Sequence, residues 1–159
     1  MFQTLLSCAV VVGATLVANP GFAQDGLPLV VVAPDGIEHT LHLDDLDAME
    51  QVSFATTTQW TENEAVFSGV AVREILEEFG IEGTVLRMSA LNDYAVEMPL
   101  DELGDEVPIV ATRIDGKVVP VREKGPYWVM FPFDRGPEFR TEVTYARSVW
   151  QLKSLSVPE

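Results

Sequence analysis

Cysteine is almost absent from this sequence, because Cys8 is the only one among 159 residues. It lies in an apolar run near the N-terminus, too early in the chain to end a lipoprotein signal. The rest of the chain has no thiol, which excludes disulfides, thiolate metal sites and cysteine nucleophiles there. The sequence also lacks a GxSxG elbow, an HExxH pair and a phosphate loop. None of these common catalytic or nucleotide-binding motifs therefore suggests a function.

Basic residues and histidines are also scarce. The chain has 10 Lys and Arg against 25 Asp and Glu, a net charge of −15. Such a chain is repelled by nucleic acid and by anionic lipid, so we expect neither as a partner. His39 and His42 point to opposite faces if they lie on a strand, which argues against a shared metal. Asp44, Asp45 and Asp47 lack the glycine and final glutamate of an EF-hand loop, and they fit the first turn of a helix.

The first 23 residues have the pattern of a secretory signal peptide. An apolar run from Leu5 to about Ala18 is too short to span a bilayer comfortably. Asn19-Pro20 breaks this run, and Gly21-Phe22-Ala23 offers a small-x-small cleavage site. The absence of Lys and Arg before the run is atypical for such a signal. With 47% hydrophobic and 22% charged residues overall, we expect residues 24–159 to form one domain that is exported to the periplasm.

Short periodic segments separated by turns predict the secondary structure. The apolar stretch 29–33, the turn Pro34-Asp35-Gly36 and the alternating stretch 37–43 predict a β-hairpin. A helix is predicted over 70–79, with Ser68 as its N-cap and Gly80 at its end. Further strands are predicted at 84–90, 94–98, 108–114, 117–121, 127–131 and 148–157, with a hairpin turn at Asp115-Gly116. The predicted fold class is α+β, a mixed and mostly β-sheet domain with one or two short helices.

Five segments carry a resemblance to a known family. They are FSGVAVREILEEFGI, ALNDYAVEMPLDEL, a DGK hairpin, EKGPYWVMFPFD and YARSVWQL. In this order and spacing they resemble the oxidoreductase molybdopterin-binding domain, which has the sulfite-oxidase-like fold, in its short periplasmic form. The resemblance covers Leu41 to Val157. It implies a sulfite-oxidase-like fold with a pocket for a pterin cofactor.

The segment TTTQWTEN, residues 56–63, departs from the family pattern. Catalytic members hold molybdenum through a cysteine in the segment before the Gly-Val helix, and Trp60 stands about where that thiolate would be. Molybdenum needs the soft sulfur ligand, whereas an indole N–H is only a hydrogen-bond donor. The resemblance therefore implies a pocket that keeps the flat pterin and has lost the molybdenum. The alternative role for Trp60 is to fold back and cap the core.

Further positions match the family's cofactor pocket. Asp93 matches an acidic residue near the cofactor, and a carboxylate suits the amino and N–H edge of a pterin; its alternative role is in the turn. Lys124 and the later Tyr127-Trp128 replace a histidine and an arginine of catalytic members. Where catalytic members carry a basic residue in the last strand, this chain has the stretch Arg147-Ser148-Val149-Trp150. The candidate ligand-binding residues are Trp60, Asp93, Tyr94, Lys124, Trp128, Arg147, Ser148 and Trp150.

These last candidates also have purely structural alternatives. Trp128 and Trp150 lie in apolar segments and suit the core. Lys124 and Arg147 suit surface ion pairs in so acidic a chain.

The resemblance implies a function as well as a fold. The family includes cysteine-free periplasmic members that sense pterins and report to a membrane enzyme controlling cyclic-di-GMP. We therefore expect a non-catalytic periplasmic binding protein for a pterin-like molecule, whose partner is the periplasmic domain of a membrane signalling protein. The first alternative is a molybdopterin-dependent oxidoreductase with a non-cysteine metal site. The second is an interaction scaffold that binds no ligand.

Overall fold

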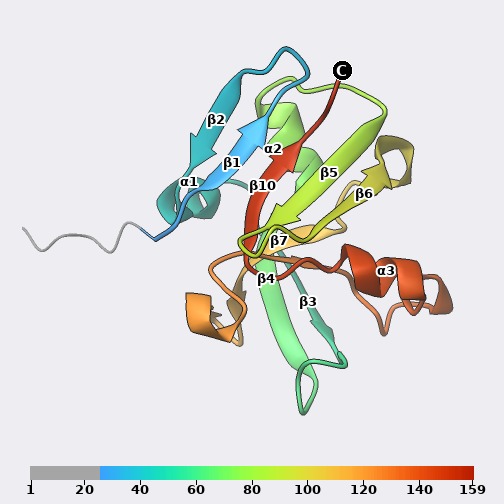
Figure 1. The fold of residues 1–159 in the computed structure, drawn as a ribbon. Coiled ribbons are helices and arrows are strands. Elements are labelled where there is room, and N and C mark those ends of the chain that lie inside the picture. The colour runs from blue at the N-terminus through green and yellow to red at the C-terminus, as the bar shows by residue number, and fades with distance from the viewer. Residues whose placement is uncertain (1–25) are drawn as a thin grey trace, which may run out of the picture.

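The computed structural model describes residues 26–159. The predicted signal peptide, residues 1–23, lies outside the described residues. The described chain forms two five-stranded β-sheets with a few short helices around them. The strands of the two sheets diverge, and the β3–β4 hairpin of the second sheet projects from the body (Figure 1).

The first sheet contains both ends of the described chain. Its strands, in spatial order, are β2 (Glu38–Leu41), β1 (Leu29–Val32), β10 (Leu152–Ser156), β5 (Val85–Ala90) and β6 (Ala95–Pro99). The predicted N-terminal hairpin is confirmed, with Leu29 opposite Leu41, but its second strand ends at Leu41 and not at Leu43, which begins the helix α1 (Leu43–Ala48). Strand β10 pairs with β1 in parallel and with β5 in antiparallel orientation. The last strand therefore inserts between the first and fifth strands and closes the sheet.

The second sheet is built around a long hairpin that the sequence did not predict. Its strands are β3 (Val52–Thr56), β4 (Ala65–Ala71), β7 (Ile109–Ile114), β8 (Lys117–Val118) and β9 (Trp128–Met130), which pairs with β7. A Cβ at Gly69 of β4 would lie 1.9 Å from the carbonyl oxygen of Val110. Only glycine permits this close approach of β7. The pairing shifts register between Ser68 and Gly69, so the strand bends at this point.

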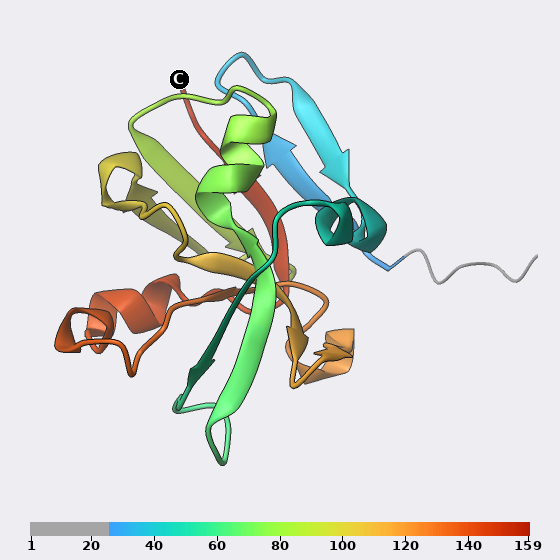
Figure 2. The same cartoon turned by 180° about the vertical axis from the view of Figure 1, so that it is seen from behind.

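The helices of the described chain are short. They are α1 (Leu43–Ala48), α2 (Val72–Glu78) and α3 (Glu142–Arg147), with 3₁₀ turns η1 (Leu100–Glu102), η2 (Val121–Glu123) and η3 (Pro137–Phe139). Helix α2 lies against one face of the first sheet (Figure 2). The prediction of this helix is correct, but Ser68 is not its N-cap. Ser68 pairs with Arg113 in the second sheet, and the helix begins only after Ala71.

Most of the predicted strands after the hairpin are confirmed, and two of these are clearly shorter than predicted. Strands 84–90, 94–98, 108–114 and 127–131 match β5, β6, β7 and β9 to within one residue at each end. Strand 117–121 stops at Val118, because Pro120 leads into η2. Strand 148–157 begins only at Leu152, because the preceding residues end α3 and Gln151 has a positive φ of 50°. Helix α3 was not predicted.

One hydrophobic cluster connects both sheets and α2. Its aromatic part includes Phe67 of β4 and Trp128 of β9, whose rings are perpendicular with centroids 5.7 Å apart. Such edge-to-face packing is the preferred arrangement of buried aromatic rings. No helix within residues 26–159 has the length and apolar character needed to cross a membrane. The predicted α+β class, dominated by strands, is confirmed.

Candidate ligand-binding site

A pocket of about 190 Å³ opens at the junction of α3, the β5–β6 turn and the β3–β4 loop. Four aromatic side chains, those of Trp60, Tyr94, Tyr145 and Trp150, line it. The rest of the lining is small or uncharged: Ala90, Asn92, Ala146, Ser148 and Val149. We call it the aromatic pocket. Its lining contains no charged residue, although the chain has a net charge of −15.

Trp60 joins the core to the aromatic pocket. Its side chain is partly buried and belongs to the loop 57–64, which we call the Trp60 loop. The ring centroid lies 5.7 Å from Trp128, 5.9 Å from Tyr145 and 6.1 Å from Phe133, with interplanar angles of 66°, 74° and 54°. The hydroxyl of Thr58 accepts the backbone N–H of Trp60 at 3.0 Å. The indole thus caps the core and also contributes to the wall of the pocket.

Tyr94 and Trp150 are the most exposed aromatic side chains of the pocket. The Tyr94 hydroxyl donates to the carbonyl oxygen of Ala146 at 2.9 Å, which links the start of β6 to the end of α3. Trp150 pairs with Trp128 through an isolated antiparallel bridge and is 39% exposed. Core packing therefore does not describe Trp150. Both rings leave apolar surface available at the mouth of the pocket.

Ser148 and Trp128 form a buried layer beneath the pocket. The Ser148 hydroxyl donates to the carbonyl oxygen of Thr144 at 2.9 Å, and the Ser148 carbonyl accepts the indole N–H of Trp128 at 3.2 Å. Trp128 is only 1% exposed and is absent from the lining. The core interpretation is thus correct for Trp128, whose single polar atom already has a protein partner. This layer supports the pocket from below, and of its two residues only Ser148 belongs to the pocket lining.

The structure places Asp93 outside the pocket. Asp93 occupies the left-handed region, with φ of 65°, in the β5–β6 turn. Its side chain is 89% exposed and accepts a hydrogen bond from Lys153 Nζ at 3.3 Å. Neighbouring Asn92 lines the pocket instead, and its side-chain oxygen accepts the backbone N–H of Tyr94 at 3.1 Å. The turn role therefore accounts for the position of Asp93.

The two candidate cations also lie outside the lining. Arg147 forms an ion pair with Glu102 at 2.6 Å and donates from Nε to the carbonyl oxygen of Glu97 at 3.3 Å. Its side chain is 14% exposed, and these contacts hold α3 against the edge of β6. Lys124 Nζ lies 5.9 Å from the ring centroid of Trp128, a cation–π arrangement. Of the eight candidates, the pocket therefore brings together Trp60, Tyr94, Ser148 and Trp150.

Sequence reasoning missed Tyr145 and Asn92. Tyr145 lies on α3, and its ring stacks on Phe133 with a centroid distance of 4.8 Å. The signal that could have found α3 is its N-cap: the Thr141 hydroxyl accepts the backbone N–H of Thr144 at 3.1 Å. Threonine followed by Glu142 is typical of a helix start. For Asn92, the sequence drew attention to the charge next to it, but the turn directs that carboxylate outward.

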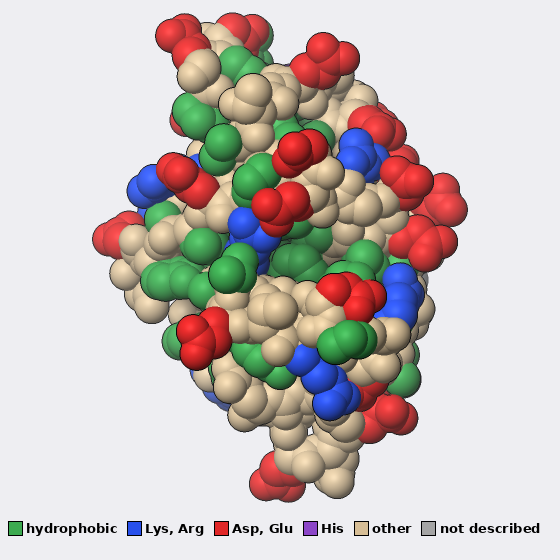
Figure 3. Space-filling view, turned by 90° about the vertical axis from the view of Figure 1, so that its right-hand side faces the viewer, with side chains coloured by type: hydrophobic (Ala, Val, Ile, Leu, Met, Phe, Trp, Pro, Cys, Tyr) green, Lys and Arg blue, Asp and Glu red, His purple; other side chains and the backbone are tan. Residues whose placement is uncertain are grey.

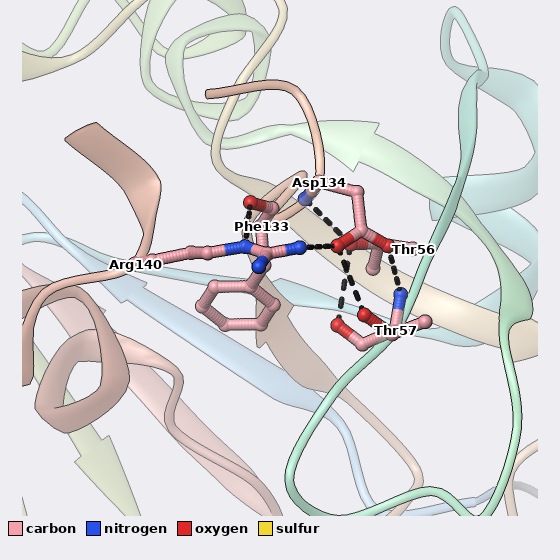
Figure 4. Close-up of polar contacts among 5 residues, drawn as sticks. All are labelled: Thr56, Thr57, Phe133, Asp134 and Arg140. Carbon is pink, nitrogen blue, oxygen red and sulfur yellow. Dashed lines mark hydrogen bonds and ion pairs between the residues drawn. The ribbon is translucent and has the colours of Figure 1, made fainter. Parts of the chain in front are cut away.

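A polar cluster connects the base of the Trp60 loop to the segment before α3 (Figure 4). The Asp134 carboxylate accepts the backbone N–H of Thr57 at 2.6 Å and its hydroxyl at 2.9 Å, and it also pairs with Arg140. In return, the backbone N–H of Asp134 donates to the buried hydroxyl of Thr56 at 3.1 Å. These contacts lower the pKa of the Asp134 carboxyl below its ordinary value, and the hydrogen bond from the Thr57 backbone N–H is the largest cause.

The donor set of the pocket fits a flat uncharged ring better than a metal. The described residues contain no group of three or more His, Cys, Asp or Glu side chains arranged to hold a metal ion. The lining has no thiolate, imidazole or carboxylate, so it does not supply the soft ligand that molybdenum requires. It also has no cation that could hold a phosphate. Aromatic walls do suit the faces of a planar heterocycle.

The wider surface contrasts with the pocket. Acidic side chains are spread over the face in Figure 3 from one end of the molecule to the other, while hydrophobic side chains gather toward its middle. Seven of the ten Lys and Arg side chains form ion pairs with carboxylates within the chain. The surface field is negative because the 25 acidic residues outnumber the 10 basic ones, whether or not these are paired.

Comparisons with known proteins identify the fold. No protein-family model matches the chain, and no curated protein shows a significant match. Among solved structures, the sulfane dehydrogenase SoxCD from Paracoccus pantotrophus is similar, with a TM-score of 0.67 and 15% identity. The similarity covers 86% of this chain but only 39% of that one. At this identity the likeness concerns the fold, since one fold hosts many activities. The chain has an α+β, sulfite-oxidase-like fold.

Proposed function

We propose that this chain is a non-catalytic binding protein for an uncharged planar heterocycle of the pterin class. One observation carries the proposal: four aromatic side chains surround a pocket that has no charged lining residue, in a chain with a net charge of −15. A pterin has two flat π-faces and is polar only at its edge, so aromatic walls with a few neutral polar groups match it. An anionic ligand gains no ion pair from such a lining.

The pocket volume restricts the size of the ligand. Its 190 Å³ exceed the roughly 150 Å³ of an apolar cavity that holds benzene. They fall below the roughly 300 Å³ at which pockets for drug-sized ligands begin. A small fused ring system therefore suits the pocket, with any substituent directed out of the mouth. The lining offers no cation to the phosphate of the complete cofactor.

Neutral groups can recognise the edge of the ring. The indole N–H groups of Trp60 and Trp150 donate to no acceptor among residues 26–159, so a ligand carbonyl or ring nitrogen that reached either group would gain a donor. The Asn92 side chain adds an amide with both donor and acceptor capacity. The guanidine-like edge of a pterin would meet this amide rather than Asp93, which faces away.

The lining also argues against catalysis at this site. It contains no His, Asp, Glu or Lys, the side chains that most often transfer protons at neutral pH. A binder without catalytic groups acts through a partner that distinguishes its loaded and empty forms. An acidic surface would steer a basic partner.

The cellular setting is part of the same proposal. Export by the predicted signal peptide would place the protein in the periplasm. The partner that the family resemblance implies is the periplasmic domain of a membrane protein controlling cyclic-di-GMP.

Calorimetric titration of the purified chain with unsubstituted oxidised pterin tests the proposal. We expect saturable binding of one pterin per chain. A pterin with a phosphorylated side chain should bind more weakly, because the surface is acidic and the lining has no cation. Lack of a binding isotherm for pterin, or stoichiometric molybdenum in protein isolated from molybdenum-replete cells, would overturn the proposal. The first result would favour an interaction scaffold, and the second would favour the oxidoreductase alternative.

A further inference from the structure

We propose that Asp134 is a positioning residue for the aromatic pocket: its carboxylate anchors the Trp60 loop, so that the Trp60 indole forms one wall. This inference rests on the proposed function, because it concerns the same pocket. Asp134 itself is not in the lining. Its effect on a ligand would therefore pass through Trp60.

The contacts of Asp134 lie at the base of the Trp60 loop. Its carboxylate accepts two hydrogen bonds from Thr57, one from the backbone at 2.6 Å and one from the hydroxyl at 2.9 Å. Thr57 is the first residue after β3, three positions before Trp60. Between Thr57 and Trp60 the chain makes a tight turn. In this turn the Thr58 hydroxyl accepts the backbone N–H groups of Trp60 and Thr61, each at 3.0 Å. The position in which Asp134 holds Thr57 thus determines where the Trp60 indole lies.

The remainder of the Trp60 loop offers little to hold it. Gln59, Glu62, Asn63 and Glu64 are all exposed. Since exposed loop tips are the least stable parts of a fold, the ends of the loop and the indole itself must fix its position. The ring contacts of Trp60 are one anchor, and the Thr57–Asp134 contacts are the other.

Asp134 also connects to the opposite wall of the pocket. Arg140 pairs with the Asp134 carboxylate and donates from Nε to the carbonyl oxygen of Phe133 at 3.0 Å (Figure 4). The Phe133 ring stacks on the Tyr145 ring, with centroids 4.8 Å apart, and its centroid lies 6.1 Å from that of Trp60. One carboxylate therefore fixes the spacing between the loop that carries Trp60 and the segment that supports Tyr145.

The chemistry of this junction requires a carboxylate. Three donors converge on Asp134: the Thr57 N–H, the Thr57 hydroxyl and the Arg140 guanidinium. Two carboxylate oxygens can accept all three, whereas asparagine has one acceptor oxygen and would turn its NH₂ group toward a donor. The substitution Asp134→Asn is therefore nearly isosteric but breaks at least one contact. A purely structural contribution to the hairpin is the competing explanation.

A double-mutant cycle on pterin binding separates the two explanations. We expect Asp134→Asn to weaken pterin binding about tenfold, the effect of one lost hydrogen bond. In a Trp60→Ala background the same substitution should have no further effect, because Asp134 acts through the indole. Asp35→Asn is the matched control, since Asp35 also accepts a backbone N–H, from Ile37, but in the β1–β2 turn. An equal loss in both backgrounds would overturn the proposal.

A measurement without ligand keeps this test independent of the proposed function. The ¹⁵N–¹H heteronuclear NOE of the Trp60 indole should fall in Asp134→Asn, while that of buried Trp128 stays unchanged. Thr57→Val removes the hydroxyl donor and keeps the backbone N–H. It should lower the pterin affinity and the Trp60 NOE as Asp134→Asn does, but by less. This variant replaces Asp134→Asn in the test if Asp134→Asn does not fold. An unchanged NOE for Trp60 in both variants would refute the anchoring role. Failure of the parent protein to bind pterin would refute only the proposed function.

Discussion

Trp60 and Trp128 meet edge to face, with ring centroids 5.7 Å apart and 66° between the ring planes. Trp128 is buried and donates its indole N–H to the Ser148 carbonyl, whereas Trp60 lines the aromatic pocket. The two rings form one packed unit with a core side and a ligand side. Substitutions on the two sides should therefore have different consequences.

Replacing Trp60 by alanine should reduce both ligand affinity and stability. Loss of an aromatic stacking platform costs about 1 to 3 kcal/mol of binding free energy. Because the indole is only partly buried, the loss in unfolding free energy should fall below the roughly 3 to 5 kcal/mol of a fully buried tryptophan. Calorimetric titration and urea unfolding measure the two effects. Trp60→Phe should retain most of the affinity, and unchanged pterin binding by Trp60→Ala would place the ligand elsewhere.

Trp150 should contribute to ligand binding but little to stability. Its side chain is 39% exposed at the pocket mouth, so Trp150→Ala should weaken pterin binding by about 1 to 3 kcal/mol. The melting temperature should stay close to that of the parent. Val143→Ala is a suitable control, because Val143 is an exposed apolar residue outside the pocket lining. A large drop in melting temperature with unaltered affinity would assign Trp150 a packing role.

Arg147 should matter for the fold and not for the ligand. Arg147→Gln removes the ion pair to Glu102 and weakens the contact with the Glu97 carbonyl at the edge of β6. Loss of such a partly screened pair should lower the unfolding free energy by about 1 kcal/mol. The pterin affinity of Arg147→Gln should change little. The pterin affinity of Asp93→Asn should also change little, because the Asp93 carboxylate faces Lys153 and not the pocket. Selective loss of pterin binding in either variant would contradict the placement of these side chains.

Tyr127 should titrate late in an alkaline scan. Burial, followed by the nearby Asp45 and Asp47 carboxylates, raises its pKa from 10.0 to about 12. The folded state thus holds this proton more tightly than the unfolded state. The resulting stability is fully present below pH 10 and is lost as the pH rises toward 12. Phenolate absorbance should show one step near pH 12 that is missing in Tyr127→Phe; an identical titration curve for that variant would contradict the assignment.

Local patterns were sufficient for elements that combine a clear periodicity with turn or cap residues at their ends. The hairpin of β1 and β2 has its turn residues between two alternating stretches, and α2 has its apolar residues on one face. Helix α3 is too short, at six residues, to show an apolar face. Strand β4 runs directly into α2, so the apolar stretch before Val72 merges with the helical pattern. Strand β4 and helix α3 therefore lack a periodic pattern of their own, and the local signal of α3 is its N-cap, Thr141.

The sequence predicted three of the four aromatic side chains of the pocket and missed Tyr145, and none of its charged candidates lines the pocket. Trp60 stood out because a large indole in a polar loop needs a contact, and the fold provides both the core and the pocket. The direction of Asp93 depends on a left-handed turn, and the partners of Arg147 come from β6 and η1. Such choices depend on tertiary geometry, because a surface charge can pair with any opposite charge that the fold brings near.

The uncharged lining of the aromatic pocket has a consequence for how the protein would respond to its surroundings. Occupancy by an uncharged ligand hardly depends on ionic strength, because there is no Coulomb attraction to screen. Encounter with a basic partner across the acidic surface would slow as salt rises, because the Debye length shrinks to about 8 Å at physiological ionic strength. Fluctuating salinity would thus leave the fraction of loaded protein constant and alter only how fast that fraction meets its partner.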